Sequence, residues 1–203
     1  MRPLLKTLLI ITVAVMGPAC SSTLHRIQSE EVSTEWKGQK YANILIIGVY
    51  DDRTYRVSAE TAFAEELKSQ GVLAEPSYDI VPDLDSLDSE EDIAQLLGGW
   101  HNDAVLSVAT IDPGYDYDYE DHLSTKGMVV LLGGRPGPYT SLGSFITWAG
   151  SGYYKPHVAL WDPASQRPLW QATTNSQTTG SESGDTKALA QFVVATLREK
   201  GML

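Results

Sequence analysis

The sequence predicts an α/β (α+β) domain: a single mixed β-sheet of about five to six strands, an antiparallel C-terminal hairpin and three main helices packed on the sheet. Two segments, 43–50 and 104–111, are continuous apolar runs rich in β-branched residues, which is typical of strands covered on both faces. Three other segments place apolar residues at helical spacing. Residues 162–168 form a turn-rich link between two alternating runs, which indicates the hairpin.

The first half of the domain is expected to run strand, helix, strand. Asn43–Tyr50 is the first interior strand, and the polar turn Asp51-Asp52-Arg53 follows it. Ser58 can cap a helix that Gly71 ends, because a serine hydroxyl accepts from free amides at a helix start and glycine adopts the left-handed conformation past a helix end. Its buried stripe would be Ala59, Ala62, Phe63 and Leu67. Val72–Tyr78 contains a proline without an amide donor and is therefore expected at the sheet edge.

A second helix and two further strands are expected in the middle of the chain. Asp88 and Glu91 have capping-box spacing at the start of a helix that stops at Gly98. Its apolar residues are Ile93, Leu96 and Leu97. Ala104–Ile111 is the second interior strand, and Met128–Leu132 has the composition of another.

The C-terminal part is expected to contain the hairpin and a last helix. His157–Trp161 and Leu169–Thr174 are the two alternating runs of the hairpin. Asp185 is expected to cap the last helix, and Gly201 lies just past its end. The buried stripe of this helix would be Leu189, Phe192, Val193 and Leu197.

The N-terminus has the three parts of a secretory leader. Arg2 and Lys6 are basic, residues 8–16 are apolar except for one threonine, and small or turn-forming residues precede Cys20, the single cysteine of the chain. The apolar run is shorter than the ~20 residues that a membrane-spanning helix needs. The segment resembles a bacterial lipoprotein signal peptide, which implies that Cys20 is acylated and becomes the first residue of the mature chain.

The leader is also compatible with an ordinary secretory signal, and the residues after Cys20 suggest the membrane to which the protein is sorted. Gly17 and Pro18 stand where the usual lipobox has leucine and a small residue, and an ordinary secretory signal cut after Ala19 would leave a free thiol. Ser21 and Ser22 resemble the sorting pattern of outer-membrane lipoproteins. The predicted organisation is therefore a signal peptide over 1–19, a polar tether over 20–40 and one domain over 41–203.

Charge and cysteine content exclude several classes of function. The formal net charge is −11, and removing Arg2 and Lys6 with the leader lowers it by two, to −13. Such a surface repels phosphate backbones, so no nucleic-acid partner is expected. A single cysteine allows no internal disulfide and no cysteine-based zinc site. No metal and no cofactor are predicted, and the sequence does not indicate an oligomeric state.

Two long segments exceed what a minimal core needs, and such segments are usually functional or disordered. Asp112–Lys126 alternates tyrosines with carboxylates, which suits either a calcium site or an extended arm; the arm is favoured, because the spacing does not match an EF-hand. Gly133–Tyr154 is rich in glycine and aromatic residues, which form either a recognition surface or a cover over the sheet. The candidate partner-binding residues are Tyr139, Phe145, Trp148, Tyr153 and Tyr154.

No catalytic residue is predicted. Ser141 lacks the first glycine of a nucleophile elbow, and Gly133–Gly137 has no Gly-Lys-Ser/Thr after it. The four histidines, His25, His101, His122 and His157, lack metal-ligand spacing, so His25 is assigned to the tether and the rest to the surface or turns. Asp51 and Asp52 follow a strand at the edge where open α/β sheets often bind ligands, but the pair suits a turn equally well.

The order of elements resembles a family. The strings are Ala64-Glu65-Glu66-Leu67-Lys68 in the first helix, Glu75-Pro76-Ser77-Tyr78, Asp103-Ala104-Val105-Leu106, and the hairpin strings Leu160-Trp161-Asp162 and Leu169-Trp170. Over residues 41–201 they look like uncharacterised periplasmic lipoproteins of Gram-negative bacteria, with a core similar to the amino-terminal domain of TolB and to the curli secretion lipoprotein domain. The resemblance implies an assembly or binding module of the cell envelope, mostly without catalysis.

The expected function is that of a lipid-anchored, non-catalytic binding or assembly module on the periplasmic side of the outer membrane. Its partners would be the membrane, through the lipid on Cys20, and another envelope protein. The alternative is an envelope protein that binds a small ligand, a glycan or calcium, or a hydrolase. That alternative would use the acidic tyrosine-rich segment or the Asp51-Asp52 strand end.

Overall fold

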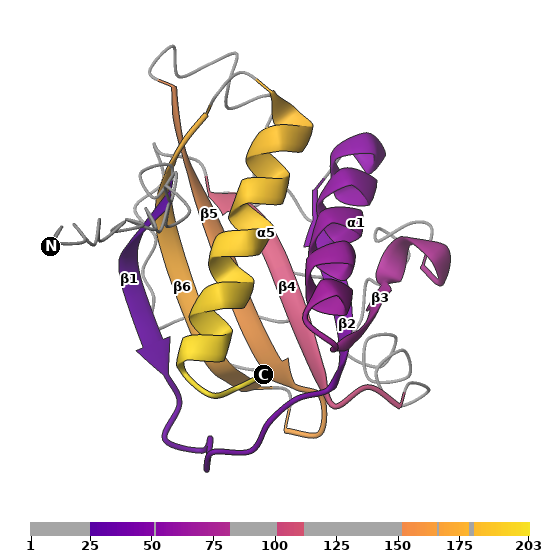
Figure 1. Ribbon diagram of the computed structural model, residues 1–203, viewed down its shortest axis with the longest axis vertical. Helices are drawn as coiled ribbons and strands as arrows, with labels where there is room; N and C mark the ends of the chain where they lie inside the picture. Colours follow the sequence, from indigo (N-terminus) through magenta and orange to yellow (C-terminus); the bar gives the residue numbers. More distant parts are fainter. Residues whose placement is uncertain (1–24, 51, 82–100, 112–151, 166, 179–180) are drawn as a thin grey trace, which may run out of the picture.

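A computed structural model describes residues 25–50, 52–81, 101–111, 152–165, 167–178 and 181–203. They form one six-stranded sheet with the order β1-β6-β5-β4-β2-β3 (Figure 1). The strands are β1 (His25–Val32), β2 (Asn43–Val49), β3 (Leu73–Pro76), β4 (Ala104–Ile111), β5 (Tyr153–Asp162) and β6 (Arg167–Gln177). The helices in the described residues are α1 (Arg53–Ser69), α5 (Glu182–Glu199) and the short 3-10 helix η1 (Ser77–Asp79).

The sheet is mixed, as predicted. β3, β2 and β4 are parallel, whereas β4, β5, β6 and β1 pair antiparallel. The C-terminal hairpin is confirmed and is longer than expected at both ends. Two of the three predicted helices correspond to α1 and α5. The predicted helix after Asp88 and the predicted strand Met128–Leu132 lie outside the described residues.

The continuous apolar runs become interior strands because both faces of the sheet are buried. In β2, Ile44 and Ile46 face the helices, while Leu45 and Ile47 face the opposite side, and all four side chains are fully buried. β3 is an edge strand, as the proline at its end predicted. The sheet therefore has a core on each face, of which only one is covered by α1 and α5.

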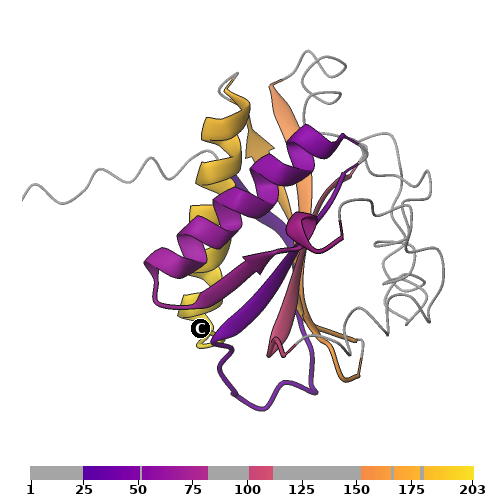
Figure 2. The same cartoon turned by 90° about the vertical axis from the view of Figure 1, so that its right-hand side faces the viewer.

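Both helices pack on the same face of the sheet and run side by side (Figures 1 and 2). The core beneath them contains Phe63 and Leu67 of α1 together with Leu189, Val193 and Leu197 of α5. The predicted stripes of α1 and α5 are thus confirmed, with Ala62 and Phe192 only partly buried. Among the residues that the structure describes, no helix combines the length and the apolar character needed to cross a membrane.

The starts of both helices were predicted too late. α1 begins at Arg53, where the Asp52 carboxylate accepts from the Thr54 amide at 2.6 Å, so Ser58 is an interior helical residue. α5 begins at Glu182 with Ser181 as its cap, while Asp185 is buried inside the first turn. In both cases an acceptor farther upstream caps the helix, because the free amides at a helix start donate to any well-placed oxygen.

The predicted ends of α1 and α5 are confirmed. Gly71 and Gly201 lie directly after the C-caps and have φ of 82° and 77°. This left-handed conformation is strained for residues with a side chain, which is why glycine ends both helices.

The predicted tether over 20–40 is wrong for His25–Val32, which form edge strand β1 paired antiparallel with β6. Polar residues hold the strand in place. The Glu30 carboxylate accepts from Trp170 Nε1 at 2.7 Å, and the Glu31 carboxylate accepts from Gln171 Nε2 at 2.9 Å. Four residues, 21–24, therefore separate Cys20 from the sheet.

Candidate functional site

One end of the domain contains the N-termini of both long helices and one terminus of five of the six strands. β2 and β4 end there, β1 and β5 begin there, and β6 ends there, because His25 pairs with Ser176 and Tyr153 pairs with Gln177. α1 and α5 begin at this end as well (Figure 1), and their N-caps are Asp52 and Ser181. We call it the N-cap end and define it by His25, Asp52, Tyr153 and Ser181. Ligands of open α/β sheets bind outside the carboxyl ends of parallel strands, which here is the same end.

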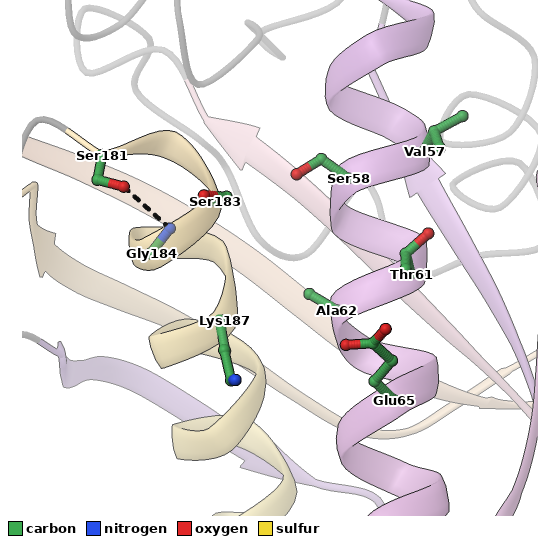
Figure 3. Close-up of a pocket in the computed structure, with 9 residues that line it drawn as sticks. All are labelled: Val57, Ser58, Thr61, Ala62, Glu65, Ser181, Ser183, Gly184 and Lys187. Carbon is green, nitrogen blue, oxygen red and sulfur yellow. Dashed lines mark hydrogen bonds between the residues drawn. The ribbon is translucent and has the colours of Figure 1, made fainter.

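A groove of about 420 Å³ lies between α1 and α5 near this end (Figure 3). Its lining includes the small residues Ala62 and Gly184, and both helices contribute hydroxyl groups. Glu65 and Lys187 contribute one charge of each sign from opposite helices. The full lining is Val57, Ser58, Thr61, Ala62, Glu65, Ser181, Ser183, Gly184 and Lys187. This chemistry suits hydrogen bonding to a small polar molecule.

The Asp52 carboxylate is engaged as a helix cap. Its Oδ1 accepts from the amides of Thr54 at 2.6 Å and Tyr55 at 3.4 Å. The pKa of Glu182 at the start of α5 is raised, first by burial and then by the negative charge of Asp52. The turn role that the sequence left open for Asp52 is therefore the one the structure supports, while Asp51 lies outside the described residues.

Separate hydrogen bonds link the end of β6 to β1 and the residue after β6 to α5. His25 Nδ1 lies 2.8 Å from Ser176 Oγ, and Thr178 Oγ1 donates to the buried Asp185 carboxylate at 2.5 Å. Burial lowers the pKa of His25, and the Asp185 charge opposes that effect. A histidine beside a serine has the chemistry of a base and a nucleophile, yet Ser176 is fully buried and also bonds Thr174. The pair therefore links elements of the fold.

The predicted aromatic surface is only partly within the described residues. Tyr139, Phe145 and Trp148 lie outside them. Tyr153 is 48% exposed, whereas Tyr154 is 1% exposed, so the assignment of Tyr154 to a binding surface is wrong. Neighbouring residues of a strand point to opposite faces, and Tyr154 points under α5, where burial raises its pKa.

A buried ion pair that the sequence analysis missed joins α1, β2 and η1. Arg56 Nε donates to Glu60 Oε1 at 2.8 Å, and both side chains are buried. Glu60 also accepts from the Gly48 amide, the Ser77 hydroxyl and the Tyr78 amide. Every contact of this carboxylate serves the fold. The signal was present in the sequence, because Arg56 and Glu60 have i,i+4 spacing on the stripe that holds Phe63.

The second face of the sheet contains another buried polar group. His157, which was predicted at the surface or in a turn, is 3% exposed on β5, and its Nδ1 lies 3.2 Å from Thr173 Oγ1. Burial lowers its pKa to about 4, so the ring is neutral at pH 7. On the same face, Trp161 Nε1 donates to Ser107 Oγ at 2.8 Å.

Metal binding has no cluster to support it in the part of the chain that the structure describes. No group of three or more histidine, cysteine, aspartate or glutamate side chains is close enough there to hold an ion. The acidic segment Asp112–Lys126, with His122, lies outside that part, as do Ser141 and Gly133–Gly137.

No protein-family model and no curated protein matches the chain. The solved structures that are similar to it include two PelC dodecamers from Paraburkholderia phytofirmans. One is a point variant that is 13% identical, with a TM-score of 0.43 over 85% of this chain and 97% of that one. The other is 12% identical, with a TM-score of 0.46 over 86% of this chain and 97% of that one. At these values the likeness supports no conclusion about function.

Proposed function

We propose that this chain is a lipid-anchored protein of the cell envelope, which acts as a non-catalytic binding or assembly module on the periplasmic side of the outer membrane. Its partners are the membrane, through a lipid on Cys20, and another envelope protein. The proposed family relationship to periplasmic lipoproteins with a TolB-like or curli-lipoprotein-like core rests on the strings quoted above. Partner contacts are proposed for Tyr139, Phe145 and Trp148.

The observation that carries the anchoring proposal is the position of Cys20 relative to the fold. It follows an apolar leader with basic residues, and the first strand begins five residues later at His25. A single chain with one thiol has no internal disulfide partner for it. An acyl chain adds about 0.8 kcal/mol of membrane affinity per buried methylene, so two or three chains would hold the domain without a spanning helix.

The use of polar groups inside the domain supports binding over catalysis. Glu60, Asp185, His157 and Arg56 are the acidic, imidazole and basic side chains buried in the described part, and each contacts groups of the fold. Catalytic acids and bases must instead reach a substrate within hydrogen-bond distance. A binding module needs only an exposed surface and a rigid frame beneath it.

The anchoring proposal is tested by the intact mass of the protein from membranes of a Gram-negative host, expressed with its own leader. We expect a chain that starts at Cys20 and carries a diacylglycerol group and an amide-linked acyl chain. A Cys20→Ser variant is the control and should not enter the membrane fraction. A mass without acyl chains would exclude the anchor.

The partner proposal is tested by crosslinking in the native envelope. We expect a discrete crosslinked protein that disappears when Tyr139 and Trp148 are replaced by alanine. A Leu73→Ala variant, which changes an exposed side chain of β3, is the matched control and should keep the crosslink. An unchanged crosslink in the aromatic variant would contradict the proposed surface.

The second candidate is a protein that binds a small ligand or glycan, and the groove between α1 and α5 favours it. Its volume falls within the range of about 300–1,000 Å³ for small-molecule sites, and it offers hydroxyls with Glu65 and Lys187. Cell-wall fragments should then raise the melting temperature, because a ligand stabilises the state it binds. A Glu65→Gln/Lys187→Gln variant should no longer show this rise in melting temperature with the fragments. No rise in the parent chain would exclude this candidate.

A further inference from the structure

The chain between the anchor and the fold is short. Five residue steps join Cys20 to His25, and an extended chain spans at most about 3.3–3.6 Å per residue, which limits the separation of their Cα atoms to about 18 Å. The predicted 20-residue tether would have allowed several times this distance. If Cys20 carries a lipid, the start of β1 therefore stays close to the membrane surface.

The start of β1 belongs to the N-cap end, and so does Tyr153. His25 pairs with Ser176 on β6, and Tyr153 pairs with Gln177 on the other side of β6. Two strand spacings of about 4.8 Å put the backbone of Tyr153 about 10 Å from that of His25. The opposite end of β1, at Val32, is seven residues or about 23 Å farther along the strand.

The burial of Tyr154 determines the direction of the Tyr153 side chain. Tyr154 is buried beneath α5, so the alternation of the strand directs the Tyr153 side chain to the opposite face, where it is 48% exposed. The other exposed large apolar side chains in the described residues are the aliphatic Val32, Leu73 and Ile80. Tyrosine combines an apolar ring with a polar hydroxyl and is enriched at the interface between lipid and water.

Two cations share the face and the end of Tyr153. Lys155 lies two residues along β5, and Arg26 pairs with Asn175, which stands two residues before the Tyr153 partner Gln177. Arg26 is exposed and Lys155 half-buried, and neither forms an ion pair with a residue in the described ranges. A chain of net charge −11 thus presents two positive groups beside its exposed tyrosine. Such groups are attracted to the phosphates of anionic lipids by about 1 kcal/mol each near a surface.

We propose that Tyr153, Lys155 and Arg26 form a membrane-facing patch that seats the N-cap end on the lipid surface to which Cys20 is attached. This inference rests on the proposed lipid anchor. It gives the anchored domain a fixed orientation: the β5–β6 turn and the start of β3 face away from the membrane.

The test uses the single cysteine of the chain. Once Cys20 is acylated, an introduced cysteine is the only free thiol and takes one fluorophore. Gln177→Cys places it beside Tyr153, and Ala164→Cys places it at the turn on the far end of the same hairpin; both positions are exposed. The lipidated proteins are reconstituted into phosphatidylethanolamine and phosphatidylglycerol vesicles with nitroxide-labelled headgroups, after intact mass confirms the acyl chains.

We expect the fluorophore at residue 177 to be quenched several-fold more than the one at residue 164. Tyr153→Ser should reduce the quenching at 177, and the Arg26→Gln/Lys155→Gln variant should reduce it most at low salt. Leu73→Ser removes an exposed apolar residue from the other end and should change nothing. Circular dichroism confirms that each variant is folded.

The outcomes separate the two proposals. Equal quenching at both positions, stronger quenching at 164, or no effect of the patch substitutions would overturn the membrane-facing patch while the lipid anchor stands. A mass without acyl chains would overturn the anchor and the patch together.

Discussion

The stability of the domain should fall on mild acidification because of one buried histidine. His157 lies on β5 between β4 and β6, with Ala109 and Thr173 as its strand partners. Burial removes the imidazolium from water and lowers the pKa of His157 from 6.5 to about 4. The folded protein therefore keeps this ring neutral at pH values where the unfolded chain protonates it.

The size and sign of the effect follow from the two pKa values. Between pH 6.5 and about 4 the unfolded state binds a proton that the folded state does not, so the free energy of unfolding decreases as the pH falls through this window. At about 1.4 kcal/mol for each pKa unit, the difference between the two pKa values corresponds to a change of about 3 kcal/mol in the free energy of unfolding. The contribution is fully present above pH 6.5 and is lost by about pH 4.

The assay is urea denaturation of the mature chain at several pH values between 7.5 and 4, for the parent protein and for His157→Gln. We expect the parent to lose about 3 kcal/mol more than the variant over this range, since glutamine does not titrate there. His101→Gln changes an exposed histidine and is the matched control. Its free energy of unfolding should change with pH as that of the parent does. Identical slopes for the parent and His157→Gln would refute the reasoning.

Three further predictions concern stability and are measured by the same denaturation at pH 7.5. Glu60→Ala should cost about 3–5 kcal/mol because it removes the carboxylate that pairs with the buried Arg56 guanidinium. Glu60→Gln/Arg56→Met should cost less, and the reverse order would contradict the buried pair. Asp52→Ala should cost about 1 kcal/mol because it removes the N-cap of α1. An equal loss of stability in Ser58→Ala would instead support a helix that starts at Ser58. Gly71→Ala should cost about 1–2 kcal/mol because of its φ of 82°, and an unchanged midpoint would argue against that conformation.

The regular elements were predictable where local pattern and burial agree. β2 and β4 are continuous apolar runs, and only strands covered on both faces tolerate them. The end of α1 at Gly71 depends on the conformation of a single residue, which glycine adopts without strain. Such signals lie within a few residues of the element they define.

The predictions failed where the outcome depends on a distant partner. β1 has a polar sequence, and its pairing depends on Glu30 with Trp170, 140 residues away. Alternation places Tyr153 and Tyr154 on opposite faces, but which face lies beneath a helix depends on where α5 packs. The same holds for the burial of His157 and Asp185.

The sequence by itself determined the interior strands, the edge position of β3 and the C-terminal hairpin, because each depends on composition or spacing within one segment. Only the tertiary structure decided that β1 begins five residues after Cys20, and that Arg26, Lys155 and Tyr153 share one end and one face. The physical reason is the strand register. Hydrogen bonds between segments more than 100 residues apart set that register, and no local pattern specifies it.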